Sequence, residues 1–91
     1  MTSIIKKDLL IMDVPYSDFT WNSGWKQFVS TAVTIPTGRT VVGLLVTPTN
    51  VTAVMSGRIN GLHQIQVAGI YTGDATSIDG TATFTCKILL Q

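Results

Sequence analysis

The last stretch of the chain, Thr81–Leu90, decides the fold, and it reads TATFTCKILL. Apolar residues occupy every second position of this stretch, and threonine or lysine stands between them up to Lys87. The apolar positions are Ala82, Phe84, Cys86, Ile88 and Leu90. Because successive side chains of a β-strand point to opposite faces of the sheet, this alternation predicts a strand with one face in a core and the other toward solvent.

Threonine and valine are frequent along the rest of the chain, and β-branched residues of this kind suit pleated strands. They predict further strands at Asp8–Val14, Lys26–Ile35, Thr40–Thr47, Ala53–Ile59 and Leu62–Tyr71. Strands at such short and regular spacing predict an all-β fold, a small antiparallel β-sandwich of about five to six strands. The run from Val41 to Val46 is apolar on both sides of the pleat, as expected for a central strand.

The N-terminal part of the chain has a less regular pattern. The apolar run Ile4–Met12 is short enough to form either a strand or a helix, and residues 15–24 are expected to be irregular. We therefore divide the chain into an N-terminal attachment segment or extra strand over residues 1–20 and an antiparallel sandwich domain over residues 21–91.

Two turns are expected between these strands. Asn60 and Gly61 tolerate the positive φ angles of a type I′ turn, so the two residues predict a tight hairpin. The register of such a hairpin would pair Ile59 with Leu62, Arg58 with His63, Met55 with Gln66 and Val54 with Val67. The sequence Pro36-Thr37-Gly38-Arg39 predicts the second turn. Residues 72–80, TGDATSIDG, are expected to form a polar loop before the last strand.

The composition predicts an oligomer. The chain has 91 residues, of which 45% are hydrophobic and only 12% are charged, whereas an ordinary soluble domain carries about 25% charged residues. A single domain of this size buries only about two-thirds of the surface of its unfolded chain, which leaves a monomer marginally stable. Burial against other copies of the chain reconciles small size with high apolarity, so we expect an obligate homo-oligomer.

Nucleic-acid and membrane partners are not expected. The net charge is +1 and the basic residues are scattered, whereas nucleic-acid binding requires a basic face that neutralises phosphates. No stretch is long enough to span a membrane. The N-terminus lacks the pattern of a signal peptide, so we expect synthesis in the cytoplasm.

The sequence contains no pattern typical of an enzyme or a metal site. His63 is the only histidine, and Cys86, the only cysteine, lies on the apolar face of its strand, where a buried inert thiol is expected. All five acids are aspartates. Asp74 and Asp79 each adjoin a glycine of the polar loop, and we expect their side chains to stabilise turns. The alternative is a calcium site, but the ligand spacing of a calcium loop is not matched. We therefore expect no catalysis, no cofactor and no metal.

Aromatic and polar residues in or near the expected loops are the candidate ligand contacts. Trp21 and Trp25 bracket a short polar segment, and aromatic rings on loops can stack on the apolar faces of sugars. The alternative is that these rings cap one end of the sandwich or pack between subunits. The full candidate set is Trp21, Trp25, Arg58, Asn60, His63, Tyr71 and Asp74.

Several segments together resemble a known family. They are WNSGWKQF at residues 21–28, a strand ending in VTIP at residues 33–36, VVGLLVTPTN at residues 41–50, and the closing run of alternating threonines. In this pattern the chain from Trp21 to Leu90 resembles the head domains of bacteriophage tail-fibre and receptor-binding proteins. Those domains often have the H-type lectin fold, a six-stranded antiparallel sandwich that forms trimers and binds sugars. They commonly carry a tryptophan near the end of the last strand, where this chain has FTCKILLQ, so the resemblance assigns no ligand contacts.

The resemblance implies a non-enzymatic adhesion module of a phage virion, a homotrimer that recognises a host-surface saccharide and leaves the cell by lysis. The alternative is a structural virion subunit of a tail, baseplate or capsid, with no ligand of its own. Low charge and strands with two apolar faces favour both functions equally. The expected partners are sister subunits, other virion proteins and a host-surface glycan.

Overall fold

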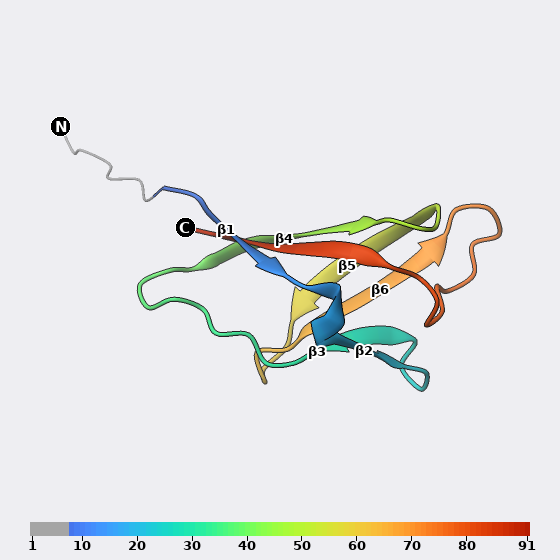
Figure 1. Cartoon of the computed structure of the whole chain (residues 1–91), viewed down its shortest axis with the longest axis horizontal. Coiled ribbons are helices and arrows are strands. Elements are labelled where there is room, and N and C mark those ends of the chain that lie inside the picture. Colours follow the sequence, from blue (N-terminus) through green and yellow to red (C-terminus); the bar gives the residue numbers. More distant parts are fainter. Residues whose placement is uncertain (1–7) are drawn as a thin grey trace.

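The computed structural model describes residues 8–91, which form an all-β fold with one short 3-10 helix. The elements are β1 (Leu10–Val14), η1 (Tyr16–Asp18), β2 (Phe19–Asn22), β3 (Gln27–Ser30), β4 (Val41–Pro48), β5 (Ala53–Ile59), β6 (Ile65–Tyr71) and β7 (Phe84–Leu90). The strands form two antiparallel sheets, one with the order β1-β7-β4 and the other with the order β2-β3-β6-β5 (Figure 1). The predicted antiparallel sandwich is confirmed, and these residues supply seven strands instead of five to six.

The strand that decided the fold has the predicted alternation. β7 lies between β1 and β4 in the three-stranded sheet, and Ile88 is paired with Met12 on one side and Leu44 on the other. Its inward side chains and the preceding Ala82 are all buried, whereas Thr85 is exposed. The predicted burial of Cys86 is confirmed, and this burial raises the pKa of its thiol.

An aromatic cluster around Phe84 joins the two sheets. The ring centroids of Tyr16, Phe19 and Phe28 lie 5.0, 4.9 and 5.1 Å from that of Phe84, in edge-to-face arrangements. Such pairs contribute about 0.5–1.5 kcal/mol each beyond the burial of their surface. The Tyr16 hydroxyl donates a hydrogen bond of 2.7 Å to the carbonyl of Ala82, which satisfies the polar end of this part-buried ring.

The connection between β5 and β6 is longer than predicted. It spans residues 60–64, so the two-residue hairpin at Asn60-Gly61 is wrong. The observed pairs are Ile59 with Ile65, Arg58 with Gln66, Met55 with Gly69 and Val54 with Ile70. For the same four β5 residues, in the same order, the tight turn predicted the partners Leu62, His63, Gln66 and Val67. The register is therefore shifted by three residues. Because three is odd, the shift moves each β6 side chain to the other face relative to β5.

The Asn60 side chain explains the longer turn. Its Oδ1 accepts hydrogen bonds from the N–H groups of Leu62 and Gln64, at 2.9 and 3.0 Å, and its Nδ2 donates to Gln64 Oε1 at 3.1 Å. The left-handed conformation falls on His63, with φ of 60°, and not on Gly61. An asparagine that bonds backbone groups ahead of it stabilises a turn of its own, so the Asn-Gly pair did not determine the length.

The predicted strand Lys26–Ile35 is too long. Pairing ends at Ser30, and residues 31–40 belong to no strand because they cross from the four-stranded sheet to the three-stranded one. The predicted turn within this crossing is confirmed. The Arg39 N–H donates to the carbonyl of Pro36 at 3.1 Å, and Gly38 has a φ of 83°.

β4 is an edge strand and not the predicted central one. Its outward residues Val42 and Leu45 are consequently 53% and 50% exposed. A run that is apolar on both faces thus lies at the edge of a sheet, with one apolar face turned to solvent.

The N-terminal region is more regular than expected. Residues 15–24 contain η1, β2 and the first part of the β2–β3 turn. The helix alternative for Ile4–Met12 is wrong over its C-terminal part, because Leu10–Met12 belong to β1, which pairs with β7. The first part of that run, up to Lys7, lies outside the described residues.

Candidate functional site

The outer face of the four-stranded sheet carries the clearest group of polar side chains. Strand register places Arg58 of β5 beside Gln66 of β6, and Gln66 beside Val29 of β3. Gln27 lies two residues before Val29 on the same face of β3, next to Asn22 of β2. Four neighbouring strands thus present one guanidinium and several amides in adjacent rows.

Arg58 is held in place by a buried amide. Its Nε donates a hydrogen bond of 2.8 Å to Gln66 Oε1. Gln66 is only 7% exposed although it is polar, and a buried side chain of this kind has little freedom to move away. The terminal guanidinium nitrogens of Arg58 have no partner among residues 8–91. The ion pair found among these residues joins Lys87 and Asp13, on the other sheet.

Trp25 borders the same face of the sheet. It lies in the turn between β2 and β3 and is 64% exposed. The Asn22 side chain accepts a hydrogen bond of 2.9 Å from the backbone N–H of Trp25, and Lys26 takes the left-handed conformation with φ of 55°. A single turn with an asparagine cap therefore fixes the backbone that carries the ring.

Two shallow hollows flank the Trp25 ring. One has a volume of about 330 Å³ and is lined by Trp25, Gln27, Arg58 and Gln66. The other has a volume of about 530 Å³ and extends over Thr20, Asn22, Val29 and Gln64. An exposed aromatic plane bordered by amide and guanidinium donors offers both a stacking surface and directional hydrogen bonds.

Two of the seven candidate residues from the sequence, Trp25 and Arg58, meet at this site. Trp21 points into the sandwich instead. Its ring lies 4.9 Å from that of Phe28, and a side chain at Gly80 would touch it at 3.0 Å. Trp21 still borders the second hollow with one part of its surface.

Asn60 and His63 belong to the β5–β6 turn. The Asn60 side chain is engaged by the three hydrogen bonds described above. His63 is exposed, and its carbonyl accepts a hydrogen bond of 2.8 Å from the N–H of Val33, which ties the turn to the crossing segment. Both residues have a clear structural task in this turn.

Tyr71 and Asp74 lie near the opposite end of the β5–β6 pair from Arg58. The Asp74 carboxylate accepts hydrogen bonds from the hydroxyl and the N–H of Thr76, which lower its pKa. The Tyr71 hydroxyl accepts a 3.3 Å hydrogen bond from the N–H of Asp79. These contacts stabilise the polar loop and place both residues away from the Trp25 site.

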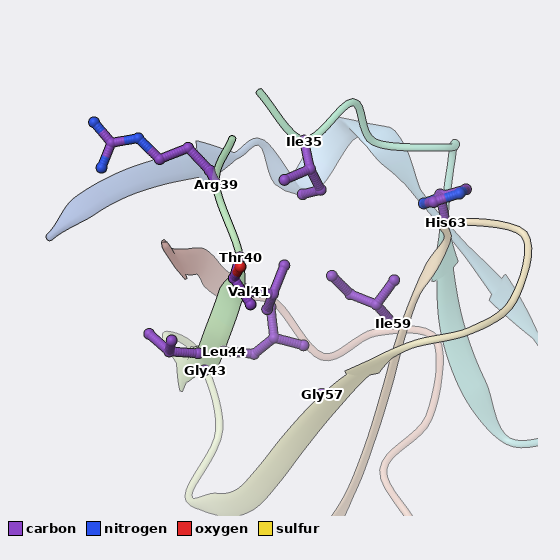
Figure 2. A pocket seen from close by; sticks show the side chains of 10 residues that line it. Ile35, Arg39, Thr40, Val41, Gly43, Leu44, Gly57, Ile59 and His63 are labelled. Atoms are coloured by element: carbon purple, nitrogen blue, oxygen red, sulfur yellow. The ribbon is translucent and has the colours of Figure 1, made fainter. Parts of the chain in front are cut away.

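A second, apolar cleft separates the two edge strands that face each other across the sandwich. β4 and β5 are joined at one end of the molecule and diverge toward the other (Figure 1). The cleft has a volume of about 680 Å³, and Ile35, Val41, Leu44 and Ile59 form its apolar walls, with His63 at the margin (Figure 2). Its polar lining residues are Arg39, Thr40 and His63, and Figure 2 shows the Arg39 guanidinium directed away from the apolar walls.

Over residues 8–91 no three His, Cys, Asp or Glu residues come together in a way that could hold a metal ion. His63 and the buried Cys86 lie on different parts of the sandwich, one in the β5–β6 turn and the other in the middle of β7. The arrangement around Trp25 can bind a ligand through stacking and hydrogen bonds, and this is the chemistry that it offers.

Sequence reasoning missed Gln27 and Gln66. Both residues were visible in the sequence as polar positions within apolar strands, but the wrong hairpin register paired Arg58 with His63. The correct register, set by the Asn60 turn, is what brings Gln66 to Arg58.

Comparison with protein-family models, curated proteins and solved structures found no match for this chain. Among the described residues there is no helix of the length and apolarity needed to cross a bilayer.

Proposed function

We propose that this chain is a non-enzymatic adhesion module that binds a saccharide on the outer face of its four-stranded sheet. The observation that carries the proposal is the exposed Trp25 ring beside the Arg58–Gln66 pair. The resemblance to phage tail-fibre and receptor-binding heads supports a role in recognising a host surface from a virion.

The physical basis is the amphipathic character of sugars. A pyranose ring presents C–H groups on its faces and hydroxyl groups at its edge. An aromatic ring packs against the C–H face. The Gln27 amide and the Arg58 guanidinium, which line the same hollow as Trp25, can exchange hydrogen bonds with the hydroxyls. A shallow hollow of about 330 Å³ is wide enough for one or two sugar residues and leaves a longer glycan free to continue over the surface.

The test is binding of the full chain to a glycan array and to isolated bacterial cell walls. The Trp25→Ala variant should lose binding about ten-fold or more, because it removes the stacking surface. Leu62→Ala is the matched control, since Leu62 is 72% exposed in a different loop. Absence of binding to any glycan or cell wall by the unaltered protein would refute the proposal.

The opposite face of the molecule favours assembly with other protein chains. The outer face of the three-stranded sheet carries Ile11 and Leu45, which are 52% and 50% exposed, and Val42 in a bulge of β4 is 53% exposed. Ile11 lies in the row of Leu89, whereas Leu45 lies in the next row, beside Lys87. Exposed apolar residues that gather on one face are typical of surfaces that other chains cover. We propose that this face, defined by Ile11, Val42 and Leu45, packs against sister subunits, with a trimer as the preferred assembly.

The same apolar face would serve a structural virion subunit equally well. Electron microscopy of the assembled particle separates the two functions. A position at an exposed tip supports adhesion, whereas a position inside a tail, baseplate or capsid lattice, with the Trp25 site covered by neighbours, supports the structural function.

A further inference from the structure

The charges on the outer face of the four-stranded sheet have one sign. Arg58 lies on this face, and the exposed Lys26 follows Trp25 in the β2–β3 turn. Of the five aspartates on the described chain, Asp8 precedes β1, Asp13 is on β1, and Asp74 and Asp79 are in the loop after β6. Asp18 ends η1 directly before β2, and three strand spacings, or about 14 Å, separate β2 from β5, which carries Arg58.

The Arg58 guanidinium is oriented by one hydrogen bond and keeps two donor nitrogens available for a ligand. Its Nε is occupied by Gln66 Oε1 at 2.8 Å, which fixes the plane of the guanidinium while its two terminal nitrogens remain without a partner among residues 8–91. A planar fork of donors binds carboxylate or phosphate oxygens in pairs, and lysine lacks this geometry. An arginine that only needed solvation would not require a nearly buried glutamine to orient it.

We propose that the saccharide bound at this site is anionic, with its carboxylate or phosphate group bound by Arg58 while a sugar ring packs on Trp25. The inference rests on the proposed saccharide-binding function and specifies its ligand class. Two classes of saccharide carry an anionic group with two oxygens that Arg58 could bind. One class contains a uronic or sialic acid, and the other is a polymer in which phosphodiesters link sugars or polyols.

The experiment uses a glycan panel in which each acidic member has a neutral partner. Uronic- and sialic-acid glycans are paired with their methyl esters, and a poly(glycerol phosphate) polymer is paired with a neutral glucan. The full chain should bind at least one acidic class roughly ten-fold or more tightly than its neutral partner. This preference should shrink as salt rises, because salt screens exposed charges.

Variants assign the preference to Arg58. Arg58→Gln should bring acidic and neutral members to equal affinity, while Trp25→Ala should weaken both. Arg39→Gln is the matched control, since it removes one positive charge from the crossing segment, where Arg39 donates to the carbonyl of Asp8. Gln66→Met should reduce the preference only partly, because the charge stays and its orientation is lost.

The outcomes separate the two proposals. Equal binding of acidic and neutral partners by the unaltered protein overturns the anionic ligand and leaves saccharide binding in place. A preference that survives in Arg58→Gln also overturns the assignment. Failure to bind any member of the panel or any cell wall removes the proposed function itself.

Discussion

The two sheets turn different outer faces to solvent. On the three-stranded sheet Ile11 lies at an apolar end, Leu45 lies in the next row beside the Lys87–Asp13 ion pair of 2.8 Å, and exposed threonines follow. On the four-stranded sheet amides surround an oriented arginine under an exposed tryptophan. The first surface offers mainly apolar contacts with little direction, which suits a sister chain. The second offers directional donors in shallow hollows, which suits a small polar ligand.

The difference shows that low charge alone does not define one kind of surface. A composition with 12% charged residues predicted apolar groups outside the core, and the three-stranded sheet carries them. The four-stranded sheet is equally poor in charge but uses uncharged amides. The most exposed aliphatic residues of its strands, Val54 and Ile70, are paired with each other at the end away from Arg58.

The largest expected effect is on the free energy of unfolding, which should differ between substitutions on the inner and the outer face of β7. Ile88 is fully buried at the centre of this strand, and Ile88→Ala should lower the free energy of unfolding by about 2–5 kcal/mol through lost burial and a cavity. Lys87→Ala, the next residue on the outer face, breaks only an exposed ion pair and should cost less than about 1 kcal/mol. Urea unfolding measures both. Equal costs would contradict the layered core.

A smaller effect tests which outer face binds sister chains. The double variant Ile11→Gln with Leu45→Gln should weaken self-association about ten-fold or more, because it replaces two half-exposed apolar side chains on the proposed interface. Val54→Gln with Ile70→Gln makes the same change on the other sheet and should leave association unchanged. Light scattering over a concentration series gives the mass of each variant.

The result has two informative alternatives. If the Val54 and Ile70 pair controls the mass instead, the interface lies on the four-stranded sheet and would compete with the saccharide site. If the unaltered protein remains a monomer at high concentration, the proposed oligomer is wrong and the resemblance to trimeric fibre heads loses support.

The smallest effects concern the turn that sets the register of the four-stranded face. Asn60→Ala should lower stability by about 1–2 kcal/mol, because it leaves the N–H groups of Leu62 and Gln64 without their acceptor. Gly61→Ala should change stability by less than about 1 kcal/mol, since Gly61 has no positive φ and a methyl group there meets nothing within 4 Å. A type I′ turn would give the opposite ranking. Thermal unfolding of the two variants distinguishes the turns.

The sequence was informative where one local rule applied. Alternation in Thr81–Leu90 predicted a half-buried strand, and Ile88 and Leu90 are fully buried. The turn at Pro36–Arg39 was predicted correctly because proline and glycine fix backbone angles locally. Of the ligand-contact candidates, Trp25 and Arg58 were named from residue type alone.

The sequence by itself thus determined the all-β class, the core face of β7 and the burial of Cys86, because period-two patterning depends only on the strand backbone. Only the tertiary structure decided that β4 is an edge strand and that Gln66 lies beside Arg58. It likewise decided that Trp21 is inside and Trp25 outside. Those outcomes depend on strand order and register, which arise from contacts between distant segments and from one asparagine side chain in a turn.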